Sequence, residues 1–127
     1  MTHRSRLSTI VIDCRTGDLD RATEFWAAAL GAPMRRFDQA DAQNYRQLEM
    51  PGDQVAVVTQ EVDHPSRVHL DIETDDLDAE VARLEKLGAK RIAFVKRWWV
   101  MEAPTGQRFC VVRPQRPDFP KGANEWP

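Results

Sequence analysis

The hydrophobic and polar positions of this chain repeat one pattern twice. Each copy opens with a short apolar, β-branched run, Ile10–Cys14 in the first copy and Val68–Glu73 in the second, which predicts a strand. Apolar residues then recur at helical spacing as far as a glycine, Gly31 or Gly88, which predicts a helix that ends there. The apolar stripes of the two helices comprise Leu19, Ala22, Trp26, Ala29 and Leu30, and Leu77, Val81, Leu84 and Leu87.

Acidic residues stand where both helices should begin. Asp18 precedes the first helix, and Asp75 and Asp76 precede the second. Aspartate is a favoured N-cap residue, and acidic side chains in the first turn interact favourably with the helix dipole. We therefore interpret the acidic cluster around Asp76 as helix capping, and not as a metal site.

Two further strand-like runs follow each helix, joined by the turns Pro51-Gly52 and Pro104–Gly106. The runs are Tyr45–Glu49 and Gln54–Thr59 in the first copy, and Trp98–Met101 and Arg108–Val112 in the second. We predict an α+β fold of two tandem βαβββ modules in a single domain, with module 1 at about 7–62, module 2 at about 67–113 and a tail at 114–127. Because one helix covers one face of each sheet, the other face is left for a cleft.

Composition narrows the possible functions. The chain has 127 residues, 18 basic and 20 acidic side chains, and a net charge of −2, whereas nucleic-acid and anionic-membrane binding favour a basic excess. The sequence has no apolar run near the ~20 residues that span a bilayer. We expect a cytoplasmic protein with no nucleic-acid or membrane partner, in which Cys14 and Cys110 are thiols.

Three segments carry a family resemblance: His69–Asp78, Leu84–Ala89 and Pro104–Val112. With the repeat, they resemble the vicinal-oxygen-chelate (VOC) superfamily of glyoxalase I, bleomycin-resistance and extradiol-dioxygenase relatives, and in particular its small glyoxalase-like domain proteins. The resemblance implies the paired-module fold and a cleft for a small organic molecule. It leaves the reaction open, because the superfamily holds lyases, isomerases, dioxygenases and non-catalytic drug binders.

The resemblance also implies four metal-ligand places, which fall on Val11, Ala56, His69 and Cys110. Valine and alanine side chains have no donor atom, and a catalytic metal normally has about three protein ligands. We therefore expect no cofactor. The alternative is a divalent metal held by His69 and Cys110, helped by carboxylates of the same face such as Asp71.

The candidate catalytic residues are His69, Asp71 and Cys110. The place of His69 in the repeat directs its imidazole toward the cleft, where a general acid or base could act; the alternative is a hydrogen-bonded core histidine. Cys110 is either a nucleophile beside a protonated His69 or an inert thiol. Asp71 either assists His69 or anchors the turn before the second helix. We assign no function to Cys14.

The predicted ligand-binding residues are Asp13, Tyr45, Gln47, Glu49 and Trp98. Asp13 has the same turn-anchoring alternative as Asp71. Adjacent strand residues face opposite sides, so only one of Trp98 and Trp99 can reach the cleft, and we favour Trp98. Aromatic and polar side chains together are typical of a small-molecule pocket.

The sequence supports three hypotheses for function. The first is a protein with a degenerate metal site that binds or sequesters an organic ligand. The second is a lyase or isomerase that uses His69 as acid and base, with or without a divalent metal. The third is a partner-binding module. We expect a homodimer in which Phe119 and Trp126 of a proline-rich, non-sheet tail pack on the body or on a second subunit, and we interpret His3 and His64 as loop residues.

Overall fold

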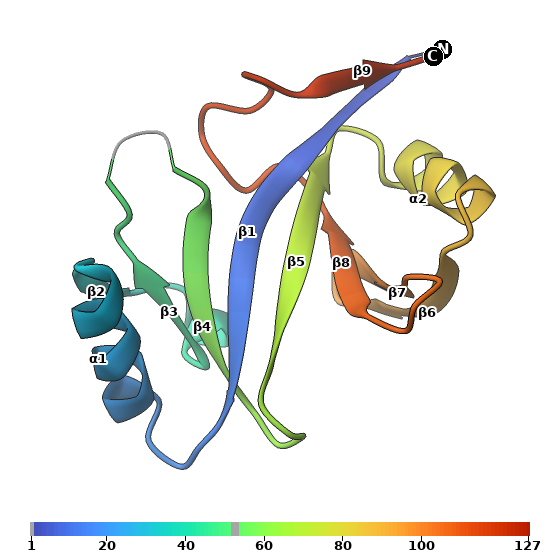
Figure 1. The fold of residues 1–127 in the computed structure, drawn as a ribbon. Helices are drawn as coiled ribbons and strands as arrows, with labels where there is room; N and C mark the ends of the chain where they lie inside the picture. The colour runs from blue at the N-terminus through green and yellow to red at the C-terminus, as the bar shows by residue number, and fades with distance from the viewer. Residues whose placement is uncertain (1, 52–53) are drawn as a thin grey trace. The chain divides into compact units, whose positions relative to one another are not determined.

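The computed structural model describes residues 2–51 and 54–127 (Figure 1), so Gly52 of the predicted Pro51-Gly52 turn lies outside it. The described residues form nine strands, two α-helices and a short 3₁₀ helix at Ala40–Ala42. In chain order the main elements are β1 (His3–Arg15), α1 (Leu19–Leu30), β2 (Met34–Arg36), β3 (Tyr45–Leu48), β4 (Ala56–Val62), β5 (Arg67–Thr74), α2 (Leu77–Lys86), β6 (Lys90–Val95), β7 (Trp98–Glu102), β8 (Arg108–Val112) and β9 (Asn124–Trp126).

The predicted α+β repeat is confirmed. A strand, a helix and three strands follow one another from β1 to β4 and again from β5 to β8. The sequence located only two of the three strands after each helix. The strands it missed are β2 and β6, which come directly after the helices and begin with or contain the basic pairs Arg35-Arg36 and Lys90-Arg91, whose polarity hides the apolar signal of a strand.

The segment Thr9–Val68 forms one compact unit, which we call the N-terminal unit. Its strands follow the order β2-β3-β4-β1, with β1 and β4 parallel and the other neighbours antiparallel. Side chains of α1 pack on one face of these strands, over a core of Ile12, Cys14, Ala32, Leu48 and Val57. Alternation therefore places Val11 and Asp13 on the face opposite α1.

The second compact unit, which we call the C-terminal unit, comprises residues 2–8 and 69–127. Its strands follow the order β5-β8-β7-β6, and β9 pairs with the start of β1. The buried core beneath α2 comprises Val81, Leu84, Met101 and Val111, joined by Ile72, Leu77, Ala89, Trp99 and Phe109. The opposite face of β5, β7 and β8, which α2 does not cover, we call the open face.

Both predicted helix starts are confirmed. The Asp18 carboxylate accepts a hydrogen bond from the main-chain N–H of Arg21 (3.1 Å), and that of Asp76 accepts one from Ala79 (3.0 Å). At the end of α1, Gly31 adopts the left-handed conformation with φ 66°, which glycine enters without a steric penalty.

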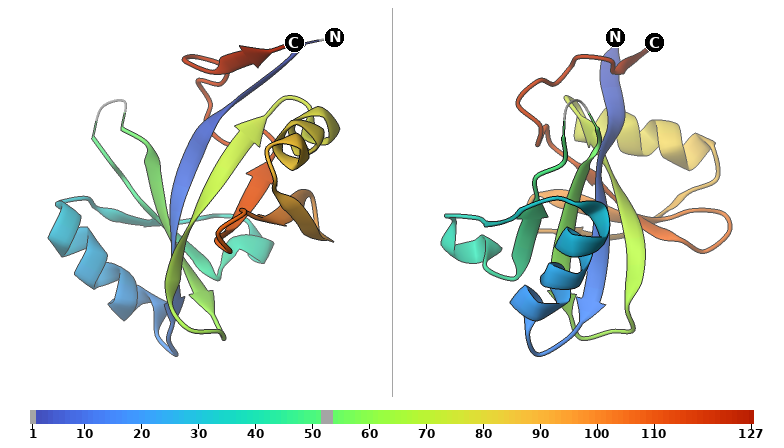
Figure 2. Two further views of the ribbon diagram at one scale, coloured as in Figure 1. Left: turned by 45° about the vertical axis from the view of Figure 1, so that its right-hand side comes forward. Right: turned by 60° about the vertical axis from the view of Figure 1, so that its left-hand side comes forward.

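The C-terminal tail corrects one prediction, because its last residues form a strand. Residues of β9 run antiparallel to the start of β1 (Figure 2). Trp126 lies opposite His3 in this pair. The prolines of the tail do not interfere, since Pro114, Pro117 and Pro120 all precede β9. The sequence showed the proline-rich segment but not that the chain resumes pairing after it.

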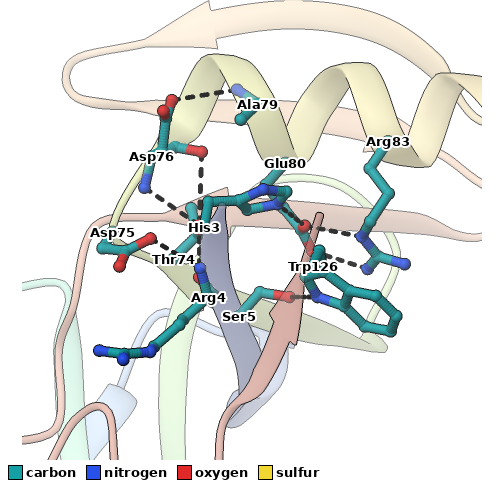
Figure 3. Close-up of polar contacts among 10 residues, drawn as sticks. All are labelled: His3, Arg4, Ser5, Thr74, Asp75, Asp76, Ala79, Glu80, Arg83 and Trp126. Atoms are coloured by element: carbon teal, nitrogen blue, oxygen red, sulfur yellow. Dashed lines mark hydrogen bonds and ion pairs between the residues drawn. The ribbon is translucent and has the colours of Figure 1, made fainter. Parts of the chain in front are cut away.

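The side chain of Trp126 packs on its own chain. Its indole N–H donates to Ser5 Oγ (2.9 Å), and the Arg83 guanidinium carbon lies 3.9 Å from the centre of its ring (Figure 3). The sequence predicted that Trp126 packs either on the body of the molecule or on a second subunit, and the structure shows it packed on the body. Trp126 therefore gives no support to a tail that clasps a second subunit.

His3 is a second correction, because it is a buried strand residue. Its Nε2 lies 2.8 Å from the Glu80 carboxylate of α2, and His3 is only 6% exposed (Figure 3). The same carboxylate accepts two hydrogen bonds of 2.9 Å from Arg83. Glu80 is fully buried, so these charge-assisted bonds compensate its loss of water.

The pKa of Glu80 gives a prediction for the pH dependence of stability. Burial alone would raise this pKa, but hydrogen bonds from Arg83, His3 and Ser5 outweigh burial and hold it below the ordinary value of 4.5. A pKa lowered by folding contributes stability above pH 4.5 that is lost as the pH falls through the lower, folded value. We expect the melting temperature to fall over this acid range, and to fall less in a Glu80→Gln variant measured by circular dichroism; parallel curves would contradict the prediction.

Candidate functional site

Three of the predicted site residues lie together on the open face of the C-terminal unit. His69 and Asp71 are two residues apart on β5, and Cys110 lies level with Asp71 on the parallel strand β8. One ligand atom of each side chain, a ring nitrogen, a carboxylate oxygen and the sulfur, lies within 4.8 Å of the other two. His69 Nε2 is 3.4 Å from Asp71 Oδ1. We call these three residues the His–Asp–Cys cluster.

The cluster is half-buried. The His69 and Asp71 side chains are 13% and 19% exposed, and Cys110 is of intermediate exposure. The oxygen of Asp71 nearest to His69 is buried and has no hydrogen bond of good geometry within the described residues. A ligand over the open face could therefore reach the cluster while much of the surrounding water is excluded, which strengthens electrostatic interactions.

The cluster fits a divalent transition metal. Imidazole nitrogen, carboxylate oxygen and thiolate sulfur are all zinc ligands, and three protein ligands with one open position are usual for a catalytic zinc ion. Asp71 would supply the third donor, which the four implied ligand places do not include; its buried Oδ1 has no hydrogen-bond partner among the described residues. Val11 and Ala56, at the other two implied places, have apolar side chains on β1 and β4.

Sequence reasoning missed two charged neighbours of the cluster. Arg108 lies two residues before Cys110 on β8, and Glu102 is its partner across the β7–β8 pair. Arg108 Nε donates to Glu102 Oε1 (3.1 Å) on the open face. Alternation from Cys110 along β8 would have located Arg108, but not its ion pair with Glu102.

The two tryptophans of β7 face opposite sides of the sheet. Val100 lies opposite Cys110 across the strand pair, so Trp98 shares the open face with Val100 by alternation. Trp99 packs with the core beneath α2 and makes an edge contact with Phe94. Trp98, as favoured from the sequence, is thus the tryptophan on the face that carries the cluster.

Asp13 lies in the N-terminal unit and is 2% exposed. Its Oδ2 lies 3.7 Å from Arg67 Nε and 4.0 Å from His64 Nε2. Asp13 also contributes to a hollow at the end of β1 whose wall includes Trp26 and Ser66. These contacts join Asp13 to the β4–β5 connection and to the start of β5, whereas its predicted anchoring of the turn before α1 stays a prediction.

The other predicted ligand-binding residues of the N-terminal unit lie on β3 or directly after it. Tyr45 and Gln47 lie opposite Gln60 and Val58 of β4, and Gln60 Nε2 donates to the Tyr45 hydroxyl (3.0 Å). Both side chains face away from α1. Glu49 comes just after β3 and pairs with Arg35 (3.1 Å) at an exposed position, which makes it the most peripheral of the predicted residues.

The two cysteines should differ in reactivity. Burial, with a smaller contribution from the charge of Asp13, raises the pKa of the Cys14 thiol, and Cys14 is only 8% exposed. A raised pKa leaves less thiolate, which is the reactive form. We expect iodoacetamide at pH 8 to alkylate Cys110 at least about tenfold faster than Cys14, measured by peptide mass spectrometry. Similar rates at the two positions would contradict this assignment.

Comparisons with known proteins place the chain among known folds. A family described as "Glyoxalase-like domain" matches residues 9–112, whereas no curated protein matches the sequence. The methylmalonyl-CoA epimerase of Mycobacterium tuberculosis is similar with a TM-score of 0.60 and 21% identity, over 87% of this chain and 88% of that one.

Two further solved structures show the same fold. A hypothetical protein of Bacillus halodurans has a TM-score of 0.56 and 12% identity, covering 90% of this chain and 99% of the other. A methylmalonyl-CoA epimerase variant of Streptomyces coelicolor, in complex with 2-nitronate-propionyl-CoA, has a TM-score of 0.54 and 19% identity, covering 86% and 98%. With 12 and 10 residues, α1 and α2 of the described chain are too short to cross a bilayer.

Proposed function

The chain belongs to the glyoxalase-like domain family, within the VOC superfamily that the sequence resembles, and from this premise we propose that it is an isomerase or lyase. Its substrate would be a small organic molecule with a carbonyl group, lying on the open face over the His–Asp–Cys cluster. The observation that carries this proposal is the cluster itself: His69 Nε2 and Asp71 Oδ1 lie 3.4 Å apart, with Cys110 beside them.

The His69–Asp71 pair suits proton transfer. A carboxylate beside Nε2 favours the tautomer that carries its proton on Nε2, which makes Nδ1 the basic nitrogen of the neutral ring. His69 could then remove a proton from the carbon next to a carbonyl, and the imidazolium could return a proton to either face of the planar enolate, which inverts that carbon when the opposite face is protonated. Asp71 stabilises that imidazolium and holds the ring in place, as a carboxylate does for a general-base histidine.

The same three residues could instead hold a divalent metal, in which case His69 would be a ligand and not the base. His69, Asp71 and Cys110 would hold it, and a bound divalent ion would polarise the substrate carbonyl and acidify the adjacent C–H. Metal analysis of protein purified without chelator, compared between the native sequence and Cys110→Ala, tests this part. One ion per chain that Cys110→Ala loses would support it.

The neighbours suggest a first substrate to test. Several of the similar structures are methylmalonyl-CoA epimerases, one of them in complex with methylmalonyl-CoA and NH4+. Epimerisation at such a carbon exchanges its proton with solvent. Methylmalonyl-CoA and a panel of smaller 2-substituted carbonyl compounds should therefore be incubated with the protein in D₂O and followed by ¹H NMR. Enzyme-dependent exchange in at least one compound is the expected result.

The second candidate function is binding without turnover. Val11 and Ala56 motivate it, because two of the four places that hold metal in relatives lack any donor atom. In the D₂O experiment, compounds that raise the melting temperature without exchanging a proton would favour sequestration over catalysis. The predicted homodimer and cytoplasmic location stay predictions, the first of which light scattering after size-exclusion chromatography tests.

A further inference from the structure

A second carboxylate on β5 is held by the C-terminal tail. Glu73 is fully buried, and its Oε2 accepts a hydrogen bond of 2.7 Å from Arg6 Nε. Its Oε1 accepts from the main-chain N–H groups of Gln115 (2.7 Å) and Arg116 (3.0 Å). A buried carboxylate is tolerated only when it is paired and hydrogen-bonded, so these donors determine where the Glu73 side chain can lie.

The tail is bound at both ends, and we call residues 113–126 the C-terminal strap. Near its start it contacts Glu73, and further on Asp118 accepts from Arg6 Nη2 (2.8 Å) while the Phe119 ring centre lies 5.3 Å from the Arg6 guanidinium. At its end Trp126 is fixed by Ser5 and Arg83, as described above. Arg6, itself only 9% exposed at its side chain, thus joins the strap to Glu73.

Glu73 lies in direct line with the His–Asp–Cys cluster. Residues 69, 71 and 73 of β5 alternate onto the same side of the strand, and Glu73 lies level with Val112 just as Asp71 lies level with Cys110. A fixed Glu73 restricts the twist and position of β5 at the next side chain along that face. His69 and Asp71 are half-buried and depend on the same strand for their relative placement.

We propose that Glu73 is a positioning residue, through which the C-terminal strap sets the geometry of the His–Asp–Cys cluster. This inference rests on the proposed function of the cluster, and it adds the strap to the parts of the molecule that build the site. Charge and direction both matter: the carboxylate faces a guanidinium on one oxygen and two N–H groups on the other. An amide cannot satisfy all three, because its NH₂ group would face Arg6 Nε–H.

The test compares two matched variants, Glu73→Gln and Glu80→Gln. Both replace a fully buried glutamate that contacts arginine. Glu80 lies on α2 and is bonded to His3 and Arg83, so it touches the strap through Arg83 at Trp126 and not at the carboxylate of β5. Two readouts report on the cluster without any substrate: the ¹H–¹⁵N signals of the His69 ring at pH 7, and the alkylation rate of Cys110 with iodoacetamide. Neither readout requires catalysis. A wild-type protein without turnover would contradict the proposed function, whereas the positioning role of Glu73 could still be tested with these two readouts.

We expect Glu73→Gln to shift the His69 ring signals and to raise the alkylation rate of Cys110 by about tenfold through easier local opening. Glu80→Gln should leave both readouts as in the wild type at a temperature where both variants are folded. Unchanged readouts in Glu73→Gln, or equal changes in both variants, would overturn the proposal.

A second variant covers the case in which Glu73→Gln does not fold. Gln115→Pro removes one strap N–H while Glu73 keeps its charge and its pair with Arg6, and proline suits an extended, proline-rich segment. The same His69 shift, with a smaller rise in Cys110 alkylation, is expected. A folded Gln115→Pro protein with a wild-type His69 spectrum would overturn the role of the strap.

Discussion

The Glu80→Ala variant is expected to lose about 3–5 kcal/mol of unfolding free energy, the usual cost of removing one member of a buried ion pair. Glu80 is fully buried, with His3 Nε2 at 2.8 Å and two Arg83 nitrogens at 2.9 Å. Alanine would leave both partners facing an empty space without an acceptor. Urea unfolding followed by tryptophan fluorescence measures the loss.

Glu85→Ala is the matched control for this stability prediction. Glu85 lies on the same helix and pairs with Arg91 at 3.0 Å, but its side chain is 39% exposed. Exposed ion pairs contribute roughly 0–1 kcal/mol. Equal losses of unfolding free energy in the two variants would contradict the prediction. They would show that the buried contacts of Glu80 with His3 and Arg83 stabilise the fold no more than the exposed Glu85–Arg91 pair does.

The His69→Ala variant is expected to lower proton exchange into the responsive substrate by about 10²–10⁴-fold, the range for removal of a general acid or base. The imidazole is the proton acceptor of the proposed reaction, and alanine leaves Asp71 without a ring to orient. The initial rate of deuterium incorporation, measured by NMR at saturating substrate, gives the comparison.

A second imidazole serves as the control for His69. His64 lies in the connection before β5, is 35% exposed at its side chain, and donates through Nδ1 to the Pro65 carbonyl oxygen (2.8 Å). His64→Ala should keep the wild-type rate. If His69→Ala retains that rate while circular dichroism shows both variants folded, His69 has no part in proton transfer.

The repeated strand–helix pattern was readable because its signals are local. Apolar spacing, an aspartate before each helix and a glycine after α1 act within a few residues, and the caps at Asp18 and Asp76 were found where expected. By contrast β2 and β9 are only three residues long. Strands this short form because a partner strand pairs with them, and the partner cannot be identified from the local sequence pattern.

The candidate site was predicted in part for the same reason. His69, Asp71 and Cys110 were identified from strand alternation and from the family resemblance, and the register of β5 with β8 brings them together. The buried contacts of His3 and Glu73 were missed, because each depends on residues 70 or more positions away or in the tail. A polar residue in a strand signals such a contact only when its distant partner is known.

The location of a bound small molecule tests the central claim most directly. Crystals should be soaked with methylmalonyl-CoA and the compounds that exchange protons, and the position of the ligand density determined. We expect density on the open face, with a carbonyl or acidic carbon beside His69 and Cys110. Density confined to the opposite side, in the hollow formed by Thr74, Trp99 and Arg113 at the start of α2, would contradict it.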